Sequence, residues 1–126
     1  MLRTGSIAQL RTNRCNIYAF RIDGRVAKAD MEEIARLMND VFDMSDKVDM
    51  LLVFDRFDGA EPGASLGWQS VKSRARSVTN VRRYVVAGAP EAAAEMVETM
   101  GRVLPVQAEA YDTEDAAWRA LDAQEL

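Results

Sequence analysis

The stretch Met50-Leu51-Leu52-Val53-Phe54, closed by Asp55, decides the fold of this 126-residue chain. It is short and continuously apolar, which predicts a strand that is buried on both faces. Strands of this kind belong to largely parallel sheets that carry helices on both sides. We therefore expect an α/β fold, with right-handed crossovers wherever neighbouring strands are parallel.

The residues before this strand predict a hairpin. Ile17–Ile22 alternates between apolar and polar residues and ends at Asp23-Gly24, a pattern typical of a strand followed by a turn. A weaker strand is expected around Ile7–Arg11. This weaker strand would pair with the strand Ile17–Ile22 through a turn at Thr12–Cys15.

A helix is expected between the hairpin and the central strand. Asp30 is the expected N-cap, and Glu33 stands three residues later in the position of a capping box. Apolar residues then recur at helical spacing to about Asp43. They are Met31, Ile34, Ala35, Met38, Val41 and Phe42.

The rest of the chain continues to alternate between helices and strands. The expected elements are a loop over Arg56–Gly63, a helix carrying Leu66 to Val78, a strand over Tyr84–Ala87, a helix from Pro90 to Gly101, a strand over Val106–Tyr111 and a helix capped by Thr113. With no linker or repeat, residues 1–126 are expected to form one domain.

The sequence composition limits the cellular compartments in which the protein is expected. The single cysteine, Cys15, cannot form an internal disulfide, which favours a reducing compartment, and we expect it to be partly buried. Nothing resembles a signal peptide, and no apolar run approaches the ~20 residues that span a bilayer. We expect a cytoplasmic protein that can also be peripheral to a membrane.

Recognisable catalytic groups are missing. The chain contains no histidine, which removes Ser-His and Cys-His pairs and most zinc sites. It also lacks a Walker loop and a Gly-x-Gly-x-x-Gly segment. We therefore expect a protein that is not an enzyme and has no catalytic residues, cofactor or metal. Asp55 and Asp58 keep one alternative open, because two carboxylates after a central strand could hold magnesium instead of serving as turn residues.

A basic segment stands out against the net charge of −4, which itself disfavours nucleic-acid binding. Its cations are Lys72, Arg74, Arg76, Arg82 and Arg83. They form either a solvated surface or a contact for anionic lipid headgroups, phosphate or an acidic partner. Trp68 and Leu66 lie beside this segment, a composition typical of a membrane-surface contact.

Seven methionines suggest a second feature, since most of them are expected on the apolar faces of the helices and strands. These are Met31, Met38, Met44, Met50, Met96 and Met100. Methionine is adaptable core filler, but it also suits a soft-walled cavity for an apolar ligand. Both interpretations stay open. The residues expected to line such a pocket are Met38, Phe42, Phe54, Phe57, Leu66, Trp68 and Val71.

The order of several segments between Asn16 and Leu121 resembles the SpoIIAA-like family, which is related to the STAS domain and shares features with the lipid-binding CRAL-TRIO fold. These segments are Arg21-Ile22-Asp23-Gly24, Ala29-Asp30, Asp55-Arg56-Phe57-Asp58-Gly59, Arg83-Tyr84-Val85-Val86-Ala87-Gly88 and Tyr111-Asp112-Thr113-Glu114-Asp115-Ala116-Ala117-Trp118. The resemblance implies a mostly parallel sheet of about five strands flanked by four helices. It also implies a homodimer without catalysis that opens a helix over an apolar pocket and associates with membranes.

Two functions follow as hypotheses. The first is a non-enzymatic binding module for an apolar or amphipathic ligand, with transient membrane association. The second is a STAS-type interaction domain switched by phosphorylation. Ser65, within Gly63-Ala64-Ser65-Leu66-Gly67, stands about where STAS-type regulators carry their phosphorylated serine. Here the preceding aspartate and the following glycine of the family segment are replaced, and Ser65 could equally cap a helix.

Overall fold

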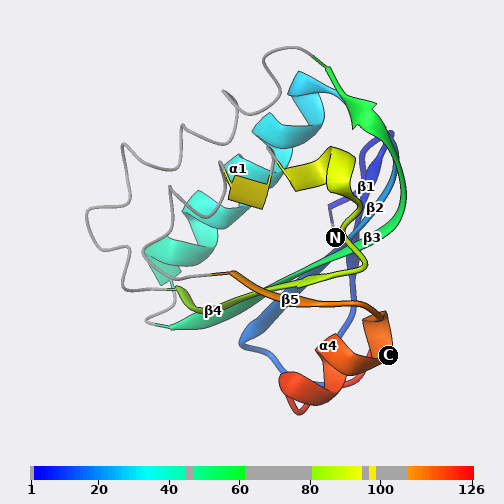
Figure 1. The fold of residues 1–126 in the computed structure, drawn as a ribbon. Helices are drawn as coiled ribbons and strands as arrows, with labels where there is room; N and C mark the ends of the chain where they lie inside the picture. Colours follow the sequence, from blue (N-terminus) through cyan, green and yellow to red (C-terminus); the bar gives the residue numbers. More distant parts are fainter. Residues whose placement is uncertain (1, 45–46, 62–80, 95–96, 99–107) are drawn as a thin grey trace.

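The computed structural model describes residues 2–44, 47–61, 81–94, 97–98 and 108–126. Its centre is a five-stranded sheet in the order β1-β2-β3-β4-β5 (Figure 1). The strands are β1 (Ile7–Leu10), β2 (Ile17–Val26), β3 (Val48–Ala60), β4 (Val81–Ala87) and β5 (Ala108–Tyr111). β1 pairs antiparallel with β2, and the other neighbours are parallel. The mostly parallel sheet and the N-terminal hairpin are therefore confirmed.

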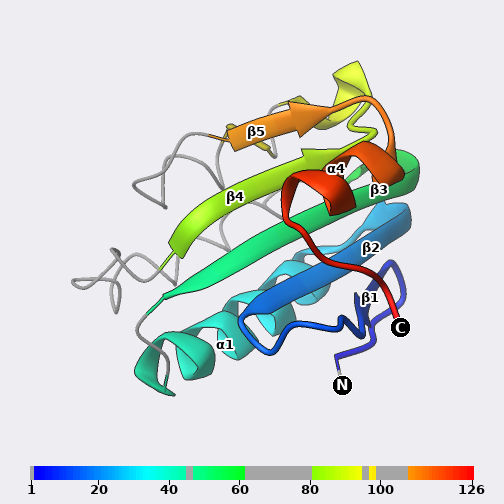
Figure 2. The same ribbon diagram turned by 90° about the horizontal axis from the view of Figure 1, so that it is seen from below.

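The central strand is buried on both faces, as its sequence predicts. Residues 48–54 of β3 are all buried. Met50, Leu52 and Phe54 join the core on one side of the sheet, and Leu51 and Val53 join the core on the other. Figure 2 shows α1 behind the sheet and α4 in front of it.

The ends of β2 and β3 differ from the prediction. Asp23-Gly24 is not a turn, and Arg56 does not begin a loop, because both strands continue side by side to Val26 and Ala60. They do so through register shifts. Gly24 has a φ of 107°, a conformation that residues with a side chain rarely adopt, and this lets β2 continue through the irregularity.

Helix α1 (Lys28–Met44) covers one face of the sheet with Met31, Ile34, Met38 and Val41. Its start corrects the predicted cap. Asp30 lies inside the first turn, where its Oδ2 accepts hydrogen bonds from the Ala27 N–H (2.9 Å) and the Ser6 hydroxyl (2.6 Å). Glu33 instead accepts a hydrogen bond from Arg36.

Helix α4 (Glu114–Ala120) covers the opposite face with Ala117 and Trp118. The predicted cap is confirmed, because the Thr113 side chain accepts a hydrogen bond from the Ala116 N–H at 3.2 Å. After the helix, the C-terminal residues return along the turn between β1 and β2. The Gln124 carbonyl accepts a hydrogen bond from the Asn13 N–H, and the Leu126 N–H donates to the Arg11 carbonyl.

Of the other two predicted helices, one lies outside the described residues and the other is described only in part. The helix carrying Leu66 to Val78 lies outside the described residues. Pro90 does not start an α-helix directly, since a short 3-10 helix, η2 (Glu91–Ala93), follows it. Four helices were expected, and the described part of the chain contains the α-helices α1 and α4, the 3-10 helix η2, and α-helical residues at 94 and 97–98.

Two individual side chains also differ from expectation. Cys15 is exposed, because it lies in the turn between β1 and β2 and not within the sheet. Met44, expected among the apolar faces, is exposed at the end of α1.

Candidate functional site

The predicted apolar pocket falls on the α1 side of the sheet as far as it is described. Met38 and Phe54 are buried in that core, and Phe42 and Phe57 are partly buried against it. Leu66, Trp68 and Val71 lie outside the described residues. Four of the seven predicted pocket residues thus share one apolar cluster, which also contains Met31 and Met50.

A bulge at Asp55 brings two of these aromatic rings together. Ile22 pairs with Phe54, and the next residue of β2, Asp23, pairs with Arg56, so Asp55 is an extra residue in β3. The extra residue shifts the alternation of side chains, which is why Phe54 and Phe57 share a face although they are three residues apart. Their rings meet edge to face, with centroids 5.7 Å apart.

The same core contains polar atoms that lack a partner. The hydroxyl of Tyr84 is fully buried and has no hydrogen-bond partner among the residues that the structure describes, and the same is true of Asn39 Oδ1. Burial raises the pKa of Tyr84 far above its ordinary value, so the phenol stays neutral. Neither residue was predicted from the sequence as part of a site. The available signal was a tyrosine inside an otherwise apolar strand, since a buried hydroxyl normally requires a partner.

Both polar residues face the part of the core that lies beside β4. Tyr84 pairs with Met50 on one side and with Ala108 of β5 on the other. Asn39 follows Asp30 by nine residues. Because an α-helix turns about 100° per residue, the two residues lie on opposite sides of the axis of α1. Because Asp30 contacts Ser6 next to the β1 edge, Asn39 is on the flank of α1 that is turned toward β4.

The structure describes only two of the five cations in the predicted anionic contact, Arg82 and Arg83. Arg82 donates two hydrogen bonds to Asp49, and Arg83 donates two to Glu109 and one to the carbonyl of Ala120 at the end of α4. The bonds from Arg83 hold the pKa of Glu109 below its ordinary value. Both arginines therefore serve ion pairs, and the contact with α4 puts Arg83 on the face of the sheet opposite α1. Lys72, Arg74, Arg76 and the candidate phosphosite Ser65 lie outside the described residues.

The acidic pair after the central strand does not converge on a common point. Arg56 lies between acidic side chains and contacts Asp58 and Asp23, each at 3.3 Å. Asp55 is exposed and lines a pocket of about 490 Å³ beside β1, together with Arg21 and Asp23. Within the described residues, no three carboxylate or thiol side chains are grouped to hold a metal ion.

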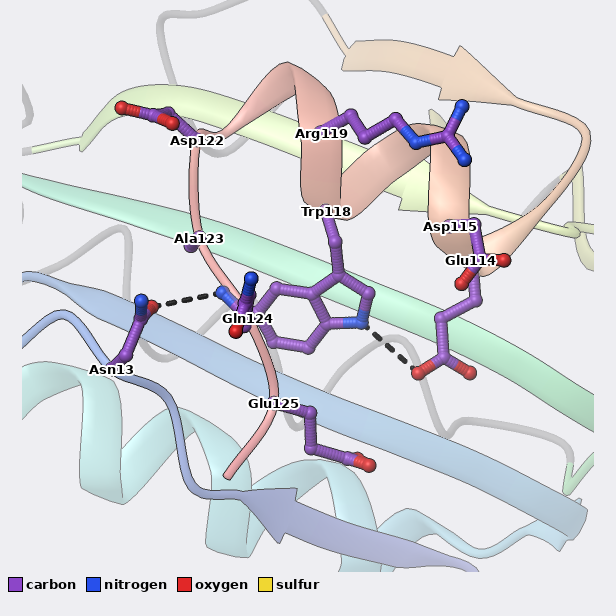
Figure 3. A pocket seen from close by; sticks show the side chains of 9 residues that line it. All are labelled: Asn13, Glu114, Asp115, Trp118, Arg119, Asp122, Ala123, Gln124 and Glu125. Atoms are coloured by element: carbon purple, nitrogen blue, oxygen red, sulfur yellow. Dashed lines mark hydrogen bonds between the residues drawn. The ribbon is translucent and has the colours of Figure 1, made fainter.

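A larger pocket, of about 640 Å³, opens on the α4 side and was not predicted (Figure 3). It is formed by α4, the C-terminal residues and Asn13. The indole of Trp118 lies at its base, 7% exposed, and donates a hydrogen bond from Nε1 to Glu114. Arg21 binds both oxygens of Glu114 and also contacts Glu125. The carboxylates around this pocket are thus largely paired within the chain, and their side chains brace α4 against the sheet.

Comparisons with known proteins agree with this architecture. The structure is similar to that of a DUF3478-family protein with a SpoIIAA-like fold from Shewanella loihica PV-4, with a TM-score of 0.65 and 17% sequence identity, over 96% of this chain and 98% of that chain. Among curated proteins, none matches this sequence. None of the described helices is long and apolar enough to cross a membrane. The SpoIIAA-like family model matches residues 17–121, so the chain belongs to the SpoIIAA-like family.

Proposed function

We propose that this chain is a non-enzymatic binding module that takes up an apolar or amphipathic, lipid-like ligand between α1 and the sheet. The SpoIIAA-like fold supports a binding or regulatory domain. The observation that carries the proposal is the Tyr84 hydroxyl, which is buried in an apolar core and has no hydrogen-bond partner within the described part of the chain.

An unpaired buried hydroxyl is costly. Leaving such a group without a partner destabilises a protein by about 1–3 kcal/mol. A ligand whose polar group reaches Tyr84 would remove that cost on binding. The surrounding side chains suit the entry of a chain-like ligand, because Met31, Met38 and Met50 are unbranched and can change rotamer with little strain.

The membrane contact is a separate part of the proposal. Because Arg82 and Arg83 already bind carboxylates, we assign attraction to anionic headgroups to Lys72, Arg74 and Arg76. Transient association with a bilayer would give an apolar ligand a route that avoids water. We also propose a homodimer, which sedimentation analysis would test, since a monomer at all concentrations would contradict it.

Native mass spectrometry tests the ligand. The purified chain is expected to carry an adduct that is lost on denaturation and recovered by organic extraction. An unliganded mass, together with no binding of n-decanol in calorimetry, would contradict the proposal.

Vesicle flotation tests the membrane contact. Vesicles with phosphatidylglycerol are expected to recruit the protein, and pure phosphatidylcholine vesicles are not. Replacing Lys72, Arg74 and Arg76 by Gln should abolish recruitment. Replacing Arg25, Arg36 and Arg119 by Gln changes the net charge equally and should preserve it. Equal loss in both variants would mean a non-specific charge effect.

The alternative function is a regulatory domain switched at Ser65. A phosphate there would add about 1.5–2 negative charges close in sequence to the basic segment. Mass spectrometry of the native protein decides this alternative, because Ser65 that is unmodified under all growth conditions would speak against it.

A further inference from the structure

We propose that the polar end of the ligand is uncharged and both donates and accepts a hydrogen bond, as a hydroxyl or primary amide does, and that Tyr84 and Asn39 bind it. This inference rests on the proposed function and specifies the chemical class of ligand for the same site.

The hydrogen-bonding capacity of the two side chains sets the first requirement. Asn39 Oδ1 only accepts, so it needs a donor, whereas the Tyr84 hydroxyl can donate to an acceptor. A group that does both satisfies the two residues together. It also satisfies Asn39 if the oxygen and nitrogen of its amide are exchanged.

The charges near the site set the second requirement. Tyr84 belongs to the apolar core on the α1 side. The buried polar and charged side chains of the described residues are Ser6, Asp30, Asn39 and Asp49, and none of these is a cation. Arg82 and Arg83 are bound to Asp49 and Glu109. Among the described residues, a carboxylate or phosphate next to Tyr84 would therefore find no buried counter-ion, and such a charge costs far more than a neutral group that is hydrogen-bonded.

A second buried carboxylate, Asp30, does not change this conclusion. Asp30 lies on the other flank of α1, where the Ser6 hydroxyl and the Ala27 N–H bind it. It could not pair with a cationic headgroup at Tyr84 without leaving those partners. Anionic and cationic headgroups are both disfavoured, and an uncharged one remains.

Calorimetry with matched probes tests the inference. At neutral pH the full chain is titrated with n-decanol, n-decanamide and sodium decanoate, which share a similar apolar tail and differ in the head. Decanol and decanamide should bind, and decanoate should bind at least about tenfold more weakly, since its charge has no partner. Decanoate binding as tightly as decanol would overturn the inference and leave the proposed function standing.

Two variants locate the head group. Tyr84→Phe should weaken decanol binding about fivefold, the effect of one hydrogen bond. Tyr18→Phe removes a hydroxyl from a partly buried tyrosine of the same core and should change little. Equal affinity in wild type and Tyr84→Phe would overturn the assignment. If none of the three probes binds the wild-type chain, the proposed function itself fails.

Discussion

Asp49 and Arg82 form an ion pair in which the aspartate side chain is 1% exposed and the arginine side chain is 56% exposed. Two hydrogen bonds join them, at 3.1 and 2.8 Å. A register shift at this point pairs Val48 with Val81 and Asp49 with Arg83, so Arg82 is an extra residue in β4. The extra residue lets the Arg82 side chain reach a carboxylate that would otherwise be buried without a cation.

Removal of this cation should cost stability. Arg82→Ala is expected to lower the free energy of unfolding by about 1–3 kcal/mol, because Asp49 then stays buried without its charged donor. Urea unfolding measures the change. Arg36→Ala breaks the exposed pair with Glu33 and should cost less than about 0.5 kcal/mol. Strict additivity of Arg82→Ala and Asp49→Asn would contradict the coupling.

Tyr84→Phe should stabilise the ligand-free protein. Removal of a paired tyrosine hydroxyl normally destabilises a core, but this hydroxyl has no hydrogen-bond partner in the described ranges that it could lose. We expect a gain of about 1 kcal/mol, the lower end of the cost of an unpaired buried group. Urea unfolding of protein stripped of ligand measures it. A loss of similar size would mean that the hydroxyl is hydrogen-bonded in solution.

Asp30 should make stability depend on acid pH. Burial opposes its ionisation, but the hydrogen bonds from Ser6 and Ala27 outweigh burial and hold its pKa below the ordinary value. A carboxyl whose pKa is lowered by folding stabilises the protein above its unfolded pKa of about 4, and this stabilisation disappears as pH falls through the folded pKa.

Asp30→Asn should therefore be less stable than wild type at neutral pH, and the difference should shrink below about pH 4. Unfolding in urea at several pH values measures it. Asp40→Asn, which changes an exposed carboxylate of the same helix, is the control. A difference between Asp30→Asn and wild type that is constant with pH would contradict the assignment.

Gly88 should not tolerate a side chain. Its φ is 65°, and an added Cβ would lie 3.2 Å from the carbonyl oxygen of Phe54. Gly88→Ala is expected to destabilise the fold by about 1–3 kcal/mol in thermal or urea unfolding. Gly5→Ala meets no atom within 4 Å and should be nearly neutral. Similar effects at the two positions would contradict the close approach.

The sequence predicts elements whose cause is local. The apolar run from Met50 to Phe54 and the cap at Thr113 depend on neighbouring residues, and both are confirmed. Asp30 was assigned to the wrong position because its partner Ser6 is 24 residues away. A pattern within a short stretch of sequence cannot predict a contact between residues that far apart.

The features of the candidate site also divide into those with a local cause in the sequence and those that depend on distant residues. Met38 was predictable from helical periodicity and Phe54 from the continuous apolar run, and the structure places both in one core. The bulge at Asp55 depends on how β2 and β3 pair, and the unpaired hydroxyl of Tyr84 depends on everything packed around it. Neither can be read from a short window of sequence.

The return of the C-terminal residues to the turn between β1 and β2 has a kinetic consequence. The hydrogen bond from the Gln124 N–H to Asn13 closes a loop of 111 residues, and the loss of chain entropy delays such contacts during folding. We expect the contact between the C-terminal residues and the turn between β1 and β2 to form after the parallel strands have paired, and to open before those strands separate. Native-state hydrogen exchange should then be faster at the Gln124 amide than at Leu51, so the two ends of the fold can separate transiently while the sheet stays intact.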